Sequence, residues 1–366
     1  MRKLILTPAL AFALFAVPAF AAQLEAPKLV PVPETEQQIA TIREGVALHD
    51  RGDYDGAIRK YEEVLKENPA SVRALYELAF AYSLKKNHKK SIEIAYRGAQ
   101  YKWDEIGLFY QLIGNNLDAT GEPKKAIEVY KAGLKHAPRM GLLHFNMAVT
   151  YRGMGNPEEA RKSLKNSLAL NPGHASSHLL LALTFFQTGY RAPALFAAAR
   201  FLTLEPATER SGVALRIAQE VMGGGATQGK NPNEINIFMN MNSKKDEGDF
   251  GAIEVLLGLS KAVALTEEGK DKNKGKTEAQ LLVEQYDTVL AVVGEQTEGK
   301  KQSAFVFKYY VPYFVELKQR GFVEPFVHYT HQRVLEGSAQ WVAENSGRVM
   351  QFLSWSKNYK WPEEAK

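Results

Sequence analysis

The sequence has no cysteine among its 366 residues, which excludes disulfides, thiol nucleophiles, thiolate metal ligands and a lipid-modified N-terminal cysteine. It also has little excess charge of one sign. Its 46 Lys and Arg face 41 Asp and Glu, and the formal net charge of +5 is too small to indicate a nucleic-acid partner. After residue 21, no apolar run is long enough to span a bilayer. With 45% hydrophobic and 24% charged residues, the chain has the composition of a globular protein.

The N-terminus has the pattern of a signal peptide. Arg2 and Lys3 precede an apolar run at 4–17, and Ala19-Phe20-Ala21 follows as a small-x-small cleavage site. A membrane anchor is the weaker interpretation, because the run is short and two prolines flank or interrupt it. We therefore expect a signal peptide at 1–21, a mature chain that begins at Ala22 with an N-terminal linker at 22–37 and no transmembrane segment, and a periplasmic or secreted location.

One outline recurs along the first half of the chain. The stretch "GDYDGAIRKYEEVLKENP" at 52–69 begins with glycine and ends with proline, and the same outline returns at 121–138, 155–172 and 189–206. A fifth copy, at 86–103, has Lys86 in place of the glycine and Trp103 in place of the proline. Two columns of small residues then step together by 34, 35, 34 and 34 positions: Ala57, Ser91, Ala126, Ala160 and Ala194, and Gly45, Ala79, Gly114, Ala148 and Ala182.

A period of about 34 residues indicates pairs of short helices that stack on one another, because neither helix of a pair can bury its apolar stripe alone. The two columns of small residues predict where the helices of one pair cross closely. The glycines predict tight turns, and the prolines predict the ends of the second helices.

These residues make the chain resemble the tetratricopeptide repeat (TPR) family over 38–208, with five repeats at 38–71, 72–106, 107–140, 141–174 and 175–208. The chain lacks the early tryptophan of the usual first helix, and Lys86 and Trp103 predict less regular packing in the second repeat. The resemblance implies an all-α solenoid, a right-handed superhelix of helix pairs, with a concave groove lined by the first helices. Such grooves bind a peptide, a helix or another protein.

The groove residues carried over from the family are mostly apolar or amide-bearing: Tyr76, Phe80, Gln111, Asn115, Phe145, Asn146, Val149, Arg152, Leu179 and Leu183. Family members that clamp a C-terminal carboxylate need cations, but Gln111 stands where the lysine is required, and Ser176 and Leu180 stand at the later cationic positions. An amide cannot balance a carboxylate, so we expect apolar or backbone recognition instead. The alternative is that the chain's own C-terminal half covers this apolar surface.

The last third of the sequence predicts further helices. After a capping helix at 209–222, a Gly-rich linker and an extended segment occupy 223–248, and a helical C-terminal domain occupies 249–366. Within that domain, 266–278 is expected to be a solvated loop. Helices are expected at 248–265, 277–293, 303–320 with a kink at Pro312, 322–335 and 338–359. The many aromatic residues of this domain indicate a core in preference to a ligand pocket.

Candidate motifs for chemistry are weak. Gly224, Gly229 and Lys230 have phosphate-loop spacing, but Asn231 replaces the Ser or Thr that would hold magnesium. His144 and His178 occupy one column of successive repeats and are interpreted as structural, although with His174 they form a loose cluster that could bind zinc.

His328 and His331 lie three residues apart, with Glu324 one turn earlier, and lack a further ligand. No Ser/His/Asp set stands out. The sequence therefore predicts a non-enzymatic adaptor or scaffold, without cofactor or metal, that binds a protein or peptide partner in the cell envelope. The alternatives are a hydrolase or metalloenzyme with its site in the C-terminal domain, and a periplasmic holdase chaperone.

Overall fold

The computed structural model describes residues 26–231, 234–238, 246–298 and 303–362. The predicted signal peptide lies outside these ranges. The chain divides into two compact units, 1–138 and 139–366. Among the helices of the described ranges, none has the length and apolar character needed to cross a bilayer.

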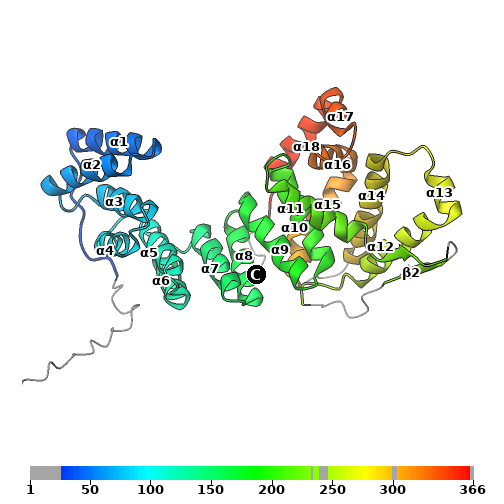
Figure 1. The fold of residues 1–366 in the computed structure, drawn as a ribbon, viewed down its shortest axis with the longest axis horizontal. Coiled ribbons are helices and arrows are strands. Elements are labelled where there is room, and N and C mark those ends of the chain that lie inside the picture. The colour runs from blue at the N-terminus through cyan, green and yellow to red at the C-terminus, as the bar shows by residue number, and fades with distance from the viewer. Residues whose placement is uncertain (1–25, 232–233, 239–245, 299–302, 363–366) are drawn as a thin grey trace, which may run out of the picture. The chain divides into compact units, whose positions relative to one another are not determined.

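The first unit consists of three helix pairs (Figure 1). Short polar side chains begin several of its helices. Thr35 forms a capping box with Gln38, and Asp53, Ser71 and Asn87 each accept a hydrogen bond from a backbone N–H of the first turn. The helices are α1 (Glu36–Asp50), α2 (Tyr54–Glu67), α3 (Val72–Leu84), α4 (His88–Gly98), α5 (Gly107–Ala119) and α6 (Pro123–His136).

The predicted column of small residues lies where the two helices of a pair meet. A Cβ atom on Gly45 would collide with the Tyr61 ring, and one on Gly114 would collide with the Tyr130 ring. Ala79, at the equivalent position of the second repeat, is fully buried. The absence of a larger side chain at Gly45 and Gly114 is therefore what allows the tyrosines of α2 and α6 to pack against α1 and α5.

Lys86 occupies the turn position that glycine holds in the other repeats. Its φ is +59°, in the left-handed region, where the turn glycines of the equivalent positions also lie. A residue with a side chain pays about 1–2 kcal/mol of conformational energy in this region. Glycine avoids this strain but loses more backbone entropy on folding, which offsets part of its advantage. We expect Lys86→Gly to raise the free energy of unfolding by about 0.5–1 kcal/mol, measured by urea denaturation. The reverse change at the matched turn, Gly121→Lys, should lower it, and a lower stability for Lys86→Gly would contradict the expectation.

The segment before α1, predicted as a linker, packs against the second repeat. The backbone N–H groups of Lys28 and Leu29 donate to the Gln100 carbonyl at 3.0 Å, and the Lys102 N–H donates to the Leu29 carbonyl at 2.8 Å. Trp103 follows Lys102 in the sequence, and its ring packs on the rings of Tyr76 and Phe109. The irregular end of the second repeat thus gains an aromatic contact in place of the proline.

The second unit begins with two more helix pairs and a capping helix (Figure 1). The five predicted repeats and the cap are therefore all formed as helices, and the all-helical TPR architecture is confirmed. The elements are α7 (Gly141–Gly153), α8 (Pro157–Leu170), α9 (Ala175–Gln187), α10 (Arg191–Leu204) and α11 (Ser211–Met222).

The remaining elements pack against these repeats within the same unit. A two-stranded antiparallel hairpin lies in the segment predicted as linker, with Ala226 opposite Ile237. The elements are β1 (Ala226–Gln228), β2 (Ile235–Ile237), α12 (Gly251–Leu265), α13 (Glu267–Asn273), α14 (Glu278–Thr297), α15 (Phe305–Gln319), α16 (Val323–His331), α17 (Ser338–Glu344) and α18 (Ser346–Asn358). Residues 239–242, predicted to continue the extended segment, lie outside the described ranges.

The aromatic residues of the C-terminal region form core, as expected. Tyr309, Tyr310 and Tyr313 on α15 are fully buried. The Tyr309 hydroxyl donates to the Leu168 carbonyl of α8 at 3.1 Å, and Trp361 stacks on Tyr313. The C-terminal helices and the fourth and fifth repeats therefore share one core.

Three predicted boundaries in this region are wrong. The segment 266–278 is not all loop, because the Thr266 hydroxyl caps the N–H of Gly269 and starts α13. The helix predicted at 322–335 ends at His331, and a turn containing Gly337 at φ +73° follows. The helix predicted at 338–359 is two helices, because Asn345 ends α17 and serves as the N-cap of α18.

A charged cluster fastens residues 246–250 to the repeats of this unit. The Glu247 side chain, 2% exposed, forms ion pairs with Lys165 and Arg161 of α8, the latter at 3.4 Å. The Tyr190 hydroxyl donates to Asp246 at 2.6 Å, and the Arg161 guanidinium lies over the Tyr190 ring. Sequence reasoning did not find this cluster, because its two carboxylates lie more than 50 residues along the sequence from Arg161, Lys165 and Tyr190.

Candidate functional site

The predicted groove residues of the second repeat form an aromatic row in the first unit. The rings of Tyr76 and Phe80 on α3 stack with centroids 6.2 Å apart, and His49 at the end of α1 lies 5.1 Å from Phe80. Both α3 residues are half-buried. This row therefore presents aromatic area that remains partly accessible on the face of the first helices.

Gln111 and Asn115 on α5 continue the predicted set in the same unit. Gln111 is half-buried and Asn115 is exposed. The Asn115 Oδ1 atom accepts a hydrogen bond from the Tyr130 hydroxyl at 2.8 Å, so this amide is oriented by α6. Removal of Asn115 would therefore cost a hydrogen bond within the repeat as well as any contact with a ligand.

Glu77 is a residue of this face that sequence reasoning missed. It follows Tyr76 and is half-buried, and this burial raises the pKa of its carboxyl group, an effect that nearby Arg73 opposes. The signal was available in the repeat register, because Glu77 occupies the position that Asn146 occupies two repeats later. A partly desolvated carboxylate at this position disfavours an anionic ligand on the second repeat.

The predicted residues of the second unit are only partly accessible. Val149 is 43% exposed, Arg152 is exposed, and Phe145 packs edge-on against His174 with centroids 4.8 Å apart. Asn146 and Leu183 are half-buried. Leu179 is only 8% exposed, which places it in the core and removes it from the candidate surface.

The C-terminal helices do not cover the α7 part of this face. They contact α10 and reach α9 through His178, whose Nδ1 atom is 2.8 Å from the Tyr310 hydroxyl. Leu142 and Val149 on α7 remain 39% and 43% exposed. Within this unit, the C-terminal helices therefore cover part of the fifth repeat, but they leave the first helix of the fourth repeat accessible.

The histidines considered as metal ligands have protein partners. His178 bonds Tyr310 and the Pro172 carbonyl, His328 bonds Ser338, and His331 bonds Thr330. Glu324 is ion-paired with Arg348 at 2.7 Å. Over the ranges that the structure describes, no group of three or more His, Asp or Glu side chains is placed to hold a metal ion.

Burial lowers the pKa of His178 to about 3 and that of His331 to about 4. Both rings stay neutral in the folded protein at pH values where they become protonated in the unfolded chain. Stability should therefore fall as pH decreases from about 6.5, by up to about 1.4 kcal/mol per pH unit for each histidine. Urea denaturation at pH 7.5, 6.0 and 5.0 measures this slope. The double variant His178→Gln with His331→Gln should flatten it, and an unchanged slope would contradict the assignment.

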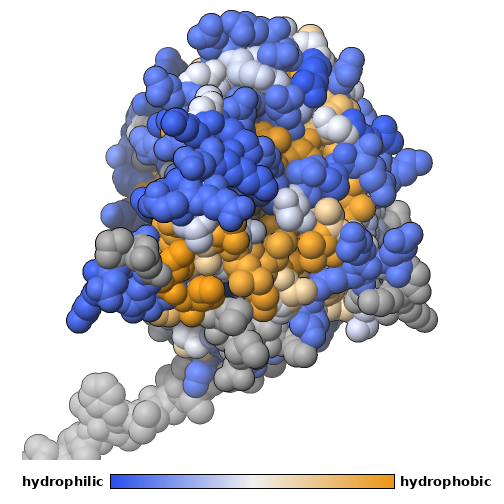
Figure 2. Space-filling view, turned by 90° about the vertical axis from the view of Figure 1, so that its right-hand side faces the viewer, coloured by the Kyte–Doolittle hydropathy of each residue, from blue (hydrophilic) through white to orange (hydrophobic). Residues whose placement is uncertain are grey.

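An apolar surface lies on the side of the second unit that contains α12 and α13. Leu259 and Val263 on α12 are 47% and 58% exposed, and Figure 2 shows apolar residues gathered on this side, with hydrophilic residues projecting beside them. A groove between these helices and α14 also includes Lys261 and Lys272. Exposed apolar area of this kind is typical of protein contact surfaces, and the sequence had not indicated it.

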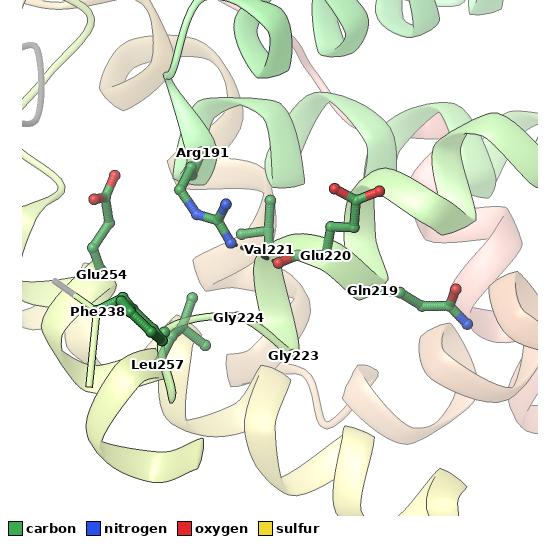
Figure 3. A pocket seen from close by; sticks show the side chains of 10 residues that line it. Arg191, Gln219, Glu220, Val221, Gly223, Gly224, Phe238, Glu254 and Leu257 are labelled. Carbon is green, nitrogen blue, oxygen red and sulfur yellow. Dashed lines mark hydrogen bonds between the residues drawn. The ribbon is translucent and has the colours of Figure 1, made fainter. Parts of the chain in front are cut away.

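A pocket of about 760 Å³ lies at the opposite end of α12, where the Gly-rich turn at 223–225 follows α11 (Figure 3). Arg191 from α10 and Glu254 from α12 both line it. The segment predicted as a flexible linker thus forms the wall of a pocket. The spacing of Gly224, Gly229 and Lys230 has no matching phosphate-loop geometry, because a helix precedes the turn and a short strand follows it.

Comparisons with known proteins concern the repeats. The family described as "TPR repeat" matches residues 45–85, and that described as "Tetratricopeptide repeat" matches 119–184. TPR repeat-containing protein MJ1428 of Methanocaldococcus jannaschii is 27% identical over 156 residues, which is 40% of this chain and 27% of that protein. The match thus spans about a quarter of the length of that relative.

Two solved structures are also similar to the repeats. The thermophilic TPR protein TTC0263 of Thermus thermophilus is 25% identical with a TM-score of 0.41, over 50% of this chain and 97% of that one. The pilF protein of Pseudomonas aeruginosa is 20% identical with a TM-score of 0.45, over 50% of this chain and 84% of that one.

Proposed function

We propose that this TPR repeat-containing protein is an exported adaptor or scaffold that binds a protein or peptide in the cell envelope through the first helices of its repeats. TPR proteins generally mediate protein–protein interactions. The observation that carries the proposal is the partial exposure of apolar and aromatic side chains, Phe80 and Val149 among them, at the positions that the family uses for binding. A partner that covers these apolar side chains removes them from water, which favours binding.

The chemistry of this surface favours an uncharged or basic segment. In the first unit, aromatic rings on α3 offer contact area and the amide of Gln111 can engage a peptide backbone as donor and acceptor. In the second unit, the amide of Asn146 can do the same. Glu77 adds a carboxylate, which would repel a terminal carboxylate of the partner. We therefore propose an internal apolar segment of the partner as the ligand, in preference to its C-terminus.

Mutation of one partly accessible or exposed residue in each unit tests the proposal. We expect Gln111→Ala with Val149→Ser to reduce capture of the partner from an envelope extract about tenfold, because lost hydrogen bonds cost about 0.5–1.5 kcal/mol each and lost apolar contact adds to this. Lys131→Ala with Lys162→Ala, exposed on second helices, is the matched control and should capture normally. Equal capture by both variants would contradict the proposal, and capture of many unrelated unfolded chains would favour the chaperone alternative.

Export is supported by the sequence pattern at 1–21 and is tested separately. We expect intact-mass measurement of the protein from the soluble envelope fraction to show a chain that begins at Ala22. Recovery of the chain with Met1 intact, in a carbonate-resistant membrane fraction, would contradict export by cleavage.

A further inference from the structure

The pocket beside the Gly-rich turn has walls from five parts of the second unit. The start of α10 contributes Arg191, the end of α11 contributes Gln219 to Val221, and the turn at 223–225 closes one side. Phe238, just after β2, and Glu254 and Leu257 on α12 complete it (Figure 3). Its volume, about 760 Å³, is in the range of sites for small ligands.

Arg191 supplies a cation to this pocket. Its Nη2 atom donates to the Glu220 carbonyl at 2.6 Å, at the C-terminal end of α11, which fixes the position of the guanidinium. The other guanidinium donors have no hydrogen bond recorded within the described part of the chain. A Cβ atom on Gly224 would lie 2.5 Å from Nη2, so the glycine is what lets the guanidinium lie against the turn.

Glu254 supplies a carboxylate that lacks a donor. Its Oε2 atom is sealed from solvent and has no hydrogen-bond partner in the described ranges. Burial raises the pKa of this carboxyl group, and Arg191 opposes the shift without forming an ion pair with it. A buried carboxylate oxygen without a donor makes the charged form of Glu254 unfavourable, and a cationic ligand group beside the carboxylate would offset this cost.

The same pocket has an apolar side. The Phe238 ring is 64% exposed at the rim, and Leu257 is buried behind it. Figure 3 shows these two side chains together, with Arg191 and Glu254 on the other side of the pocket. A ligand that fits must therefore present an anionic group, a cationic group and an apolar group.

We propose that this pocket binds a small zwitterion with an apolar side chain, an amino acid or a dipeptide. The ligand carboxylate contacts the Arg191 guanidinium in the charge-assisted manner typical of arginine, and its ammonium group donates to Glu254. Its side chain covers Phe238. This site lies apart from the first-helix surface of the proposed adaptor function and does not depend on that function.

Isothermal titration calorimetry of the mature chain tests the requirement for both charges. The probes are L-leucine, L-phenylalanine and leucyl-leucine, with 4-methylpentanoate, which lacks the ammonium group, and isoamylamine, which lacks the carboxylate. We expect at least one zwitterion to bind and each analogue of leucine to bind at least tenfold more weakly. No binding of the three zwitterions at millimolar concentration, or equal binding of the analogues, would overturn the proposal.

Two variants test which residue of the pocket binds each charged group of the ligand. Arg191→Gln should abolish the preference for leucine over isoamylamine, and Glu254→Gln should abolish the preference over 4-methylpentanoate. Arg216→Gln, an exposed arginine on α11, is the matched control and should keep both preferences. A retained preference in a folded pocket variant would overturn the assignment of that residue. If a variant fails to fold, the analogue series on the unaltered protein still decides the proposal.

Discussion

Glu247→Ala is expected to lower the free energy of unfolding of the second unit by about 3–5 kcal/mol, because it removes the buried carboxylate beside Arg161 and leaves only the solvent-exposed Asp246 carboxylate, at the same distance of 3.4 Å. The Arg161 side chain is only 7% exposed, and Glu247 lies 3.4 Å from its Nε atom. Lys165 loses the same partner. Removal of one member of a buried ion pair costs far more than the pair itself contributes, because the desolvation of the remaining charge is no longer compensated.

Asp246→Ala is the matched control for this prediction. Asp246 belongs to the same cluster, but its side chain is 56% exposed, and solvent screens its ion pair with Arg161. Asp246→Ala should lower the free energy of unfolding clearly less than Glu247→Ala does, because it removes mainly the hydrogen bond between Asp246 and Tyr190. Urea denaturation followed by tryptophan fluorescence reports on this unit, where Trp341, Trp355 and Trp361 lie. A loss of less than about 1 kcal/mol for Glu247→Ala would show that the cluster is screened by water.

Gly114→Leu is expected to destabilise the first unit by about 3 kcal/mol or more, at the upper end of the range for overpacking. Even the Cβ atom of a new side chain would lie closer than 3.0 Å to three atoms of the Tyr130 ring. The ring is 1% exposed and cannot move aside without shifting α6. Each repeat packs on its neighbours, so the disruption should spread to the second repeat.

Gly153→Leu controls for the change of residue type. Gly153 lies at the end of α7, and a Cβ atom there has no neighbour within 4 Å. It should leave stability within about 0.5 kcal/mol of the original, as surface substitutions usually do. Equal stability of the two leucine variants, measured by urea denaturation, would mean that the small column does not mark the helix crossings.

The C-terminal helices are part of the folded second unit and not a detachable lid. Tyr309 bonds the Leu168 carbonyl of the fourth repeat, and Tyr310 bonds His178 of the fifth. Arg200 on α10 donates to Ser356 on α18 at 2.7 Å. Deletion of residues 249–366 would therefore expose the core of the fourth and fifth repeats, and a gain of peptide binding after such a deletion would not be a clean measure of groove access.

The sequence alone determined the repeats, because their signal is local and periodic. Turn glycines, terminal prolines and small residues at spacings of 34 or 35 each mark a feature that recurs within one helix pair, and the structure has every one of those pairs. The Glu77 carboxylate was recoverable from the same register. The helix boundaries near Thr266 and Asn345 were missed because single capping side chains decide them.

Only the tertiary structure decided which distant groups meet. Glu247 reaches Arg161 across 86 positions of sequence, and Arg191 meets Glu254 in a pocket across the turn at 223–225. Neither pair has a spacing that a helix or strand period would reveal, because the first depends on how residues 246–250 pack against α8 and the second on how α10, α11 and α12 pack. The burial that leaves Glu254 without a donor and places Leu179 in the core likewise results from packing between elements, which no local pattern encodes.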